Sequence, residues 1–292
     1  MKKLFQMRCP SYKILFIVYA TTLLCGCASK SYDSPPGYDF RKPDLRKLGK
    51  SLNEISGITY NPEDGSLWAI SDSKRKIIGI EVKKGKLKDE TGNVVASDQD
   101  LEDIVKLDTA AYLLSSKGLI YEVPLTTKDS ASVRSYPFWS NAKNDFETLY
   151  YDPSADGLIM MCKDCEDDNG KHVRSAYRFD LKTKKFDSSA FFTINTEEVK
   201  KLVKNDDAKF DPSAAAIHPI NKRVYILSSA GNLLVVADNR GRIFEAYNLN
   251  PDEHPQAEGI AFAPNGDMYI SNEGKYGTPT LQIFKYRNGA NK

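Results

Sequence analysis

The five residues Ser56-Gly57-Ile58-Thr59-Tyr60 decide the fold, because they return near the other end of the chain as Glu258-Gly259-Ile260-Ala261-Phe262. Each copy is followed by a turn and then by an apolar run, Leu67–Ser71 in the first case and Met268–Ser271 in the second. The pattern fits three more places, so that its copies start at residues 56, 102, 147, 213 and 258. A repeat of about 45 residues is typical of a propeller blade.

Short apolar runs alternate with turn signals inside each repeat. Asp64-Gly65 and Asn265-Gly266 are examples of such turns, and Leu233–Val236 is an example of a run between them. Glycine after Asp or Asn is the strongest short-range signal for a tight turn between strands. Four short strands in each repeat predict an all-β propeller, in which every blade is a four-stranded sheet.

The number of blades follows from the five repeats and from the ends of the chain. The last repeat has room for only three strands, and residues 40–50 can supply the fourth. Pairing the two ends also covers sheet edges that would otherwise promote aggregation. We therefore predict a five-bladed β-propeller closed by an N-terminal strand, and six blades are the alternative, with a degenerate blade within residues 165–210. Residues 196–205 break the strand pattern and predict a short surface helix.

The N-terminal segment has the features of a targeting signal. Four basic residues precede or begin the apolar run Ile14–Leu24, which is too short to span a bilayer. The run ends in Leu24-Cys25-Gly26-Cys27, which resembles a bacterial lipobox and implies cleavage before Cys27 and acylation of that cysteine. A secretory signal cleaved nearby and an uncleaved anchor are the alternatives. The predicted organisation is a signal peptide (1–27), a tether (28–39) and a propeller domain (40–292).

This targeting signal implies a lipid-anchored protein of the bacterial cell envelope, with its domain facing the periplasm or the surface. The whole chain has 41 Lys and Arg against 39 Asp and Glu, but four of the basic residues lie in the predicted signal peptide. The mature chain would therefore carry a slight negative charge. It lacks the basic footprint of a nucleic-acid-binding protein, so no nucleic-acid partner is expected.

Two cysteines remain after the predicted lipidation site, in Cys162-Lys163-Asp164-Cys165. In an oxidising compartment the pattern favours a local disulfide or free thiols. A thioredoxin-like redox centre would need a βαβ unit, and a zinc site would need further ligands.

Polar residues form two columns at the starts of the predicted innermost strands. The first column is Ser56, Glu102, Glu147, Ser213 and Glu258. The second column lies two residues earlier and is Glu54, Asp100, Asp145, Asp211 and Gln256. Side chains two apart share one face of a strand, so both columns are expected at one end of the central channel.

Two interpretations of these columns stay open. Crowded carboxylates need a cation or a polar partner, and an all-oxygen set suits Ca²⁺. Alternatively, the side chains hydrogen bond to the backbone of the next blade and hold the blades together. The sequence contains no nucleophile elbow, no zinc-protease motif and no phosphate loop, so no catalytic residue is predicted.

The order of these motifs resembles a known family. The stretches Glu54–Tyr60, Asp100–Ile104, Phe146–Tyr150 and Pro255–Ala261 are similar to the SdiA-regulated (YjiK-like) β-propeller family, and so is the Ser, Glu, Glu, Ser, Glu order of the first column. The resemblance covers residues 40–288. It implies a five- or six-bladed propeller at the bacterial envelope, as a lipoprotein without a settled activity.

A more distant resemblance concerns calcium-dependent propeller hydrolases, the β-propeller phytases and paraoxonase-like lactonases. It rests on the run Glu258–Tyr269, with its Glu-Gly, Asn-Gly-Asp and Tyr elements. Phytases need basic residues for the phosphates of their substrate, whereas the inner strands here offer carboxylates. We therefore expect a non-enzymatic lipoprotein that binds a small ligand, a peptide or a cation, with a calcium-dependent phosphoesterase or lactonase as the alternative. A passive scaffold for a protein partner is the third hypothesis.

Overall fold

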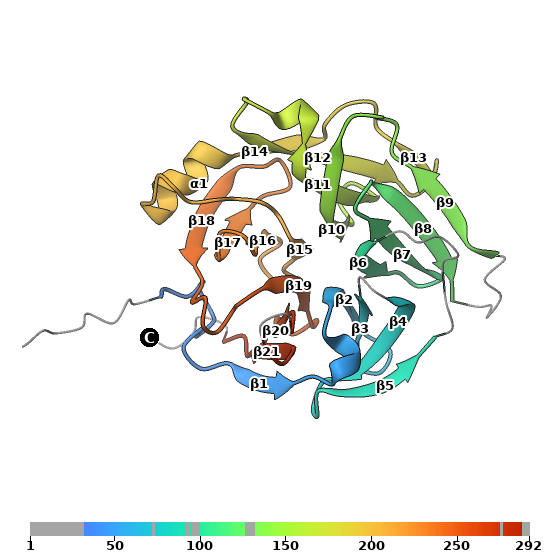
Figure 1. Ribbon diagram of the computed structural model, residues 1–292, viewed down its shortest axis with the longest axis vertical. Helices are drawn as coiled ribbons and strands as arrows, with labels where there is room; N and C mark the ends of the chain where they lie inside the picture. Colours follow the sequence, from blue (N-terminus) through green and yellow to red (C-terminus); the bar gives the residue numbers. More distant parts are fainter. Residues whose placement is uncertain are drawn as a thin grey trace, which may run out of the picture. The chain divides into compact units, whose positions relative to one another are not determined.

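The computed structural model describes residues 32–71, 74–91, 94, 100–125, 132–274 and 277–287. In these residues, five antiparallel sheets are arranged as a ring around one axis (Figure 1). The predicted all-β, five-bladed propeller is therefore confirmed. The predicted signal peptide and the predicted lipidation site, Cys27, lie outside the described residues, among which no helix is long and apolar enough to cross a bilayer.

Each blade is a meander of successive strands, numbered from the axis outward. Blade 1 consists of β2 (Ile55–Asn61), β3 (Ser66–Ser71), β4 (Lys74–Glu81) and β5 (Lys86–Glu90). Blade 2 consists of β6 (Leu101–Lys106), β7 (Ala110–Ser115), β8 (Leu119–Pro124) and β9 (Arg134–Pro137). Blade 3 consists of β10 (Asn144–Asp152), β11 (Gly157–Cys165), β12 (Val173–Asp180) and β13 (Lys185–Phe186), and β14 (Phe192–Asn195) also pairs with β12. Blade 4 consists of β15 (Ala214–Ile217), β16 (Val224–Ser228), β17 (Leu233–Ala237) and β18 (Ile243–Asn248).

Blade 5 closes the ring with strands from both ends of the chain. It contains β19 (Ala257–Phe262), β20 (Met268–Asn272), β21 (Thr280–Phe284) and, on its outer side, β1 (Asp44–Lys47). Strand β1 runs antiparallel to β21, as the blue and red ribbons of Figure 1 show. The predicted closure by residues 40–50 is confirmed. Packing begins earlier than Phe40, because Tyr38 is buried and its hydroxyl donates a 2.6 Å hydrogen bond to the Gly266 carbonyl.

The long spacing between the third and fourth repeats holds β14 and a helix. In the described residues, no sixth sheet is present in this region. Helix α1 (Thr196–Val203) is shorter than the predicted 196–205, because Lys204 has a positive φ of 54° and ends it. The side chain of Asn195 caps the helix by accepting hydrogen bonds from two backbone N–H groups. Two further short helices are η1 (Lys50–Leu52) and η3 (Glu166–Asp168).

Apolar side chains fill the spaces between neighbouring blades. Between blades 5 and 1, for example, Ile58 and Leu67 pack with Ala261 and Tyr269. This burial of strand faces is the main contribution to folding.

A buried carboxyl group also joins two blades. Asp103 accepts a 2.7 Å hydrogen bond from the backbone N–H of Leu149 in the next blade. A Cβ atom at Gly57 would lie 2.1 Å from an oxygen of Asp103, so glycine is required there. Asp103 directly follows Glu102 of the first column. It thus has the blade-joining role that we considered for the column residues.

Candidate functional site: two mouths of the channel

The first column coincides with a recurring irregularity of the innermost strands. In β6, Leu101 pairs with Ser115 and Asp103 with Leu114, which leaves Glu102 as one extra residue. In the same way, Glu147 is extra in β10 and Glu258 is extra in β19. Strand β2 has its extra residue between Ile55 and Ile58, where the column residue is Ser56. A β-bulge bends its strand and redirects the side chain of the extra residue, and bulges are frequent beside functional sites.

A set of charged and polar side chains gathers around two of these bulged glutamates. We call it the charged mouth and define it by their mutual contacts and electrostatic coupling. Its members are Asp145, Glu147, Lys163, Arg174, Asp211, Ser229, Gln256, Glu258 and Glu273.

Lys163 is the central cation of the charged mouth. Its ammonium group hydrogen bonds to the carboxylate of Glu147 and lies 3.7 Å from a carboxylate oxygen of Asp145. Burial alone would lower the pKa of Lys163, but the bond to Glu147 and the nearby carboxylates, Glu258 among them, raise it. The lysine is therefore held in its charged form. Arg174 and Asp211 form a second ion pair, at 2.5 Å.

Glu258 is the carboxyl group with the most perturbed acidity in this mouth. Burial and the nearby charge of Glu147 raise its pKa to about 8, and hydrogen bonds from Ser229 and Gln256 oppose the shift only in part. Burial also raises the pKa of Glu147, against the effect of Lys163. Glu258 is thus predominantly protonated at neutral pH unless a further positive charge approaches it.

The remaining column residues have other environments. Ser213 donates a 2.8 Å hydrogen bond to the carbonyl of Ala257 and so joins blades 4 and 5. Ser56 is buried and Glu102 is half-buried, whereas Glu54 and Asp100 are exposed. The columns therefore include blade-joining, exposed and mouth-forming residues, while Ser56 and Glu102 belong to none of these groups.

The sequence analysis missed the two cations of the charged mouth, Lys163 and Arg174. Lys163 directly follows Cys162, which occupies the place in β11 that Ser71 and Ser115 occupy in the second strands of blades 1 and 2. A comparison of the residues that directly follow this position in each repeat would have identified Lys163. Two histidines, His218 and His254, are buried, and burial lowers the pKa of each to about 4, so both are neutral core residues.

Calcium was predicted from the carboxylates alone, and Lys163 changes that argument. An ammonium group already lies among three of the carboxylates. Across the described part of the chain, no group of three or more Asp, Glu, His or Cys side chains is placed to hold a metal ion. The donor set does not fit a Ca²⁺ ion as it stands, because such an ion takes six to eight oxygen ligands. The calcium site stays a prediction.

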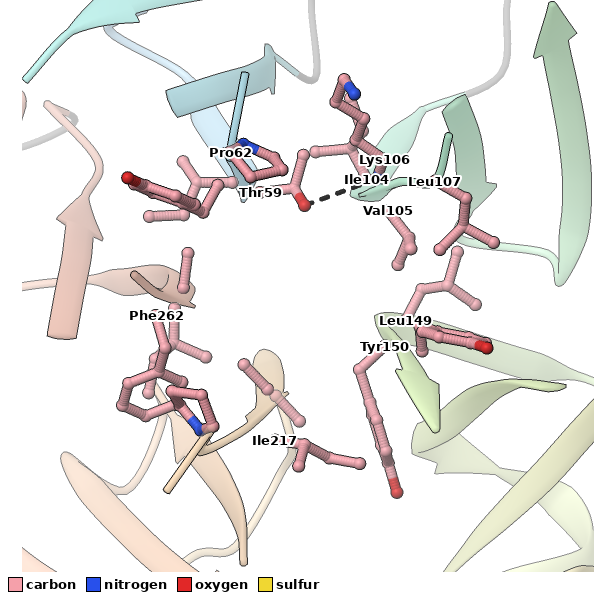
Figure 2. Close-up of a pocket in the computed structure, with 18 of the residues that line it drawn as sticks. Thr59, Pro62, Ile104, Val105, Lys106, Leu107, Leu149, Tyr150, Ile217 and Phe262 are labelled. Carbon is pink, nitrogen blue, oxygen red and sulfur yellow. Dashed lines mark hydrogen bonds between the residues drawn. The ribbon is translucent and has the colours of Figure 1, made fainter. Parts of the chain in front are cut away.

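The other ends of the innermost strands surround an apolar cavity of about 380 Å³. We call it the apolar mouth; all five innermost strands line it, with Ile104, Val105, Leu149, Ile217 and Phe262 among the side chains in Figure 2. The backbone N–H of Lys106 donates a 3.4 Å hydrogen bond to the hydroxyl of Thr59 there. The ammonium group of Lys106 pairs with Glu63 at 2.8 Å.

Comparison with solved structures shows the same fold at low sequence identity. A luciferin-regenerating enzyme is 13% identical, with a TM-score of 0.51 over 84% of this chain and 95% of that chain. A calcium-binding protein, regucalcin, from Agrobacterium tumefaciens is 12% identical, with a TM-score of 0.50 over 86% and 95%. A PQQ-bound aldose sugar dehydrogenase from Streptomyces coelicolor is 12% identical, with a TM-score of 0.51 over 87% and 100%.

At this identity the likeness concerns the fold alone. No curated protein matches the sequence. The family model described as SdiA-regulated matches residues 35–276, which include all five innermost strands. This chain therefore belongs to the SdiA-regulated family.

Proposed function

We propose that this chain is an envelope lipoprotein, anchored through Cys27, that binds a cationic ligand at the charged mouth without chemically changing it. The observation that carries the proposal is the half-buried carboxyl of Glu258 beside Glu147, in a mouth where the described carboxyl groups outnumber the described cations. Among the described residues that define this mouth, five are carboxyl groups and two are cations, Lys163 and Arg174.

The excess of carboxyl groups defines the chemistry of the ligand. Both cations already have carboxylate partners. Glu258 has hydrogen bonds from neutral side chains and two neighbouring acids that repel its charged form. A ligand with an ammonium or guanidinium group would supply the missing positive charge, and the low dielectric of the buried site would strengthen the attraction.

Binding of such a ligand is coupled to a proton. Because the pKa of Glu258 is about 8 in the free protein, a cation that binds at pH 7 favours the ionised carboxylate and releases a proton. The affinity for the cation should consequently increase as the pH rises toward 8 and then level off. A ligand held elsewhere on the surface would not show this dependence.

The proposed location rests on the N-terminal signal and is compatible with the cysteines. Cys162 and Cys165 form a disulfide, one of the two states that the sequence left open. Disulfides persist in oxidising compartments such as the periplasm. Metabolic labelling with a radioactive fatty acid tests the anchor directly: the chain should take up label, and Cys27→Ala should abolish it.

Isothermal titration calorimetry on the detergent-purified full chain tests the binding proposal. The probes are putrescine, arginine ethyl ester and CaCl₂, each titrated in two buffers of different ionisation enthalpy. We expect at least one organic cation to bind with proton release, and Glu258→Gln to weaken it about tenfold or more. Glu63→Gln, at the apolar mouth, is the matched control and should leave binding unchanged.

Four outcomes would overturn this assignment. Absence of heat with all three probes would exclude a cation site, and unchanged binding in Glu258→Gln would place the site elsewhere. Binding of CaCl₂ alone would replace the organic cation with a metal. Chelator-sensitive hydrolysis of phytate or of lactones would instead support the calcium-dependent hydrolase.

A further inference from the structure

The disulfide between Cys162 and Cys165 encloses the lysine of the charged mouth. Both cysteines are buried, and their Cα atoms lie 5.9 Å apart. Lys163, the residue after Cys162, contributes its side chain to the bond with Glu147. The covalent ring thus contains the very residue that neutralises the carboxylates of the mouth.

The pairing of β10 with β11 shows why the ring matters. Asp145 pairs with Asp164, but Phe146 pairs with Cys162, so that Lys163 is one extra residue in β11. Glu147 is the extra residue in β10, and the register beyond it is the same as before Asp145. Two bulges therefore compensate each other, and their two extra residues are the partners of one ion pair.

A regular strand could not form this disulfide. Residues three apart point to opposite faces of a regular strand, whereas the extra residue turns Cys162 and Cys165 to the same apolar face. The disulfide consequently requires the bulge at Lys163. Without the covalent bond, β10 and β11 could pair in one continuous register, in which Lys163 would lie opposite Phe146 and not beside Glu147.

We propose that the Cys162–Cys165 disulfide is a latch that holds Lys163 in the charged mouth. The disulfide acts through the lysine and does not itself contact a ligand, so the cysteines are positioning residues. The effect on ligand selectivity rests on the proposed function: the latch fixes how much of the mouth's negative charge is neutralised internally. The placement of the lysine does not depend on that function.

The reactivity of individual lysines toward an acetylating reagent tests the latch without any ligand. Lys163 has 33% of its side chain exposed and is ion-paired. Lys184, in the same blade, is 28% exposed and pairs with Glu122 at 2.7 Å, so it is a matched internal control. Acetylation rates of both residues are measured by mass spectrometry of proteolytic fragments.

The first variant is the double substitution Cys162→Ser with Cys165→Ser, since serine occupies the place of Cys162 in blades 1 and 2. We expect the acetylation rate of Lys163 to rise about fivefold, as for the loss of one ion pair of ordinary strength, while the rate of Lys184 stays the same. Glu147→Gln with the disulfide intact should raise the Lys163 rate similarly. Combining all three substitutions should add little, because they remove the same contact.

An unchanged Lys163 rate in the serine variant would overturn the latch. A fully additive effect of Glu147→Gln would do the same, because the disulfide would then act by stabilising the blade in general. If the serine variant fails to fold, both lysines react faster. The double substitution Cys162→Val with Cys165→Val is then measured in its place, because valine keeps the apolar packing. Failure of ligand binding in calorimetry leaves these rates unaffected, so the two proposals fail separately.

Discussion

The two mouths of the channel share the innermost strands β10 and β19 and yet have opposite chemistry. On β10, the charged residue Glu147 and the apolar-mouth residue Leu149 are only two positions apart, and Glu258 and Ile260 repeat this arrangement on β19. The difference arises from one extra residue near the start of the strand, which frees a glutamate from the regular pairing. Beyond the bulge, pairing is regular and the side chains pack between blades.

This contrast predicts that substitutions in the two mouths change different properties of the protein. Side chains of the apolar mouth belong to the core between blades, so changing them should cost stability. Those of the charged mouth compensate each other's charge, so changing them should alter acidity and binding with a smaller effect on folding.

The largest expected effect is a difference in the free energy of unfolding between two variants of β10, one with a substitution in each mouth. Leu149→Ala removes a buried side chain and should lower the free energy of unfolding by about 3 kcal/mol. Glu147→Ala should change it by less than about 1 kcal/mol, because the ion pair is partly exposed to solvent and Lys163 keeps Asp145 as a neighbour at 3.7 Å. Urea denaturation followed by circular dichroism measures both. Equal losses in the two variants would show that the mouths do not differ energetically in this way.

A second effect concerns pH and belongs to the charged mouth alone. The pKa of Glu258 is about 8 in the folded chain, against an ordinary value of 4.5. A folded state with the higher pKa binds the proton more tightly, so this contribution to stability is present below pH 4.5 and is lost as the pH rises through 8. A shift of this size corresponds to about 5 kcal/mol, and the partial exposure of Glu258 should reduce the measured loss to on the order of 2 kcal/mol.

Glu258→Gln should remove this pH dependence and make the variant more stable than the parent chain at pH 9. Melting temperatures recorded between pH 5 and pH 9 provide the measurement. Glu63→Gln is the control from the apolar mouth, since Glu63 is 69% exposed and should leave the pH profile unchanged. Parallel profiles for the parent chain and Glu258→Gln would contradict the raised pKa.

The repeat register in the sequence was sufficient to predict the ring of blades and its closure by residues 40–50. It was sufficient because turn residues and strand lengths recur within each repeat. The bulges were not predictable in this way, since an extra residue is defined only against the partner strand. Lys163 escaped notice for the same reason: its place in the mouth depends on a shift of β11 against β10.

Asp103 shows a further limit of the sequence pattern. It directly follows Glu102 of the column, and in a regular strand it would have been assigned to the opposite face. The bulge instead directs it into the interface, where its carboxyl accepts hydrogen bonds from the backbone N–H groups of Leu149 and of Ile104. Burial raises the pKa of Asp103 well above its usual range. Only the paired structure distinguishes this blade-joining acid from its neighbour in the column.

The smallest predicted effect compares one lysine from each mouth. Lys163→Met removes the internal cation that competes with a bound one, so the affinity for a cationic ligand should rise about threefold. Lys106→Met, at the apolar mouth, removes an ion pair with Glu63 and should leave that affinity unchanged. Calorimetric titration of both variants with the probe that binds the parent chain distinguishes them. A gain in both variants would indicate a general increase in negative charge, whereas a gain in Lys163→Met alone locates the competition at the charged mouth.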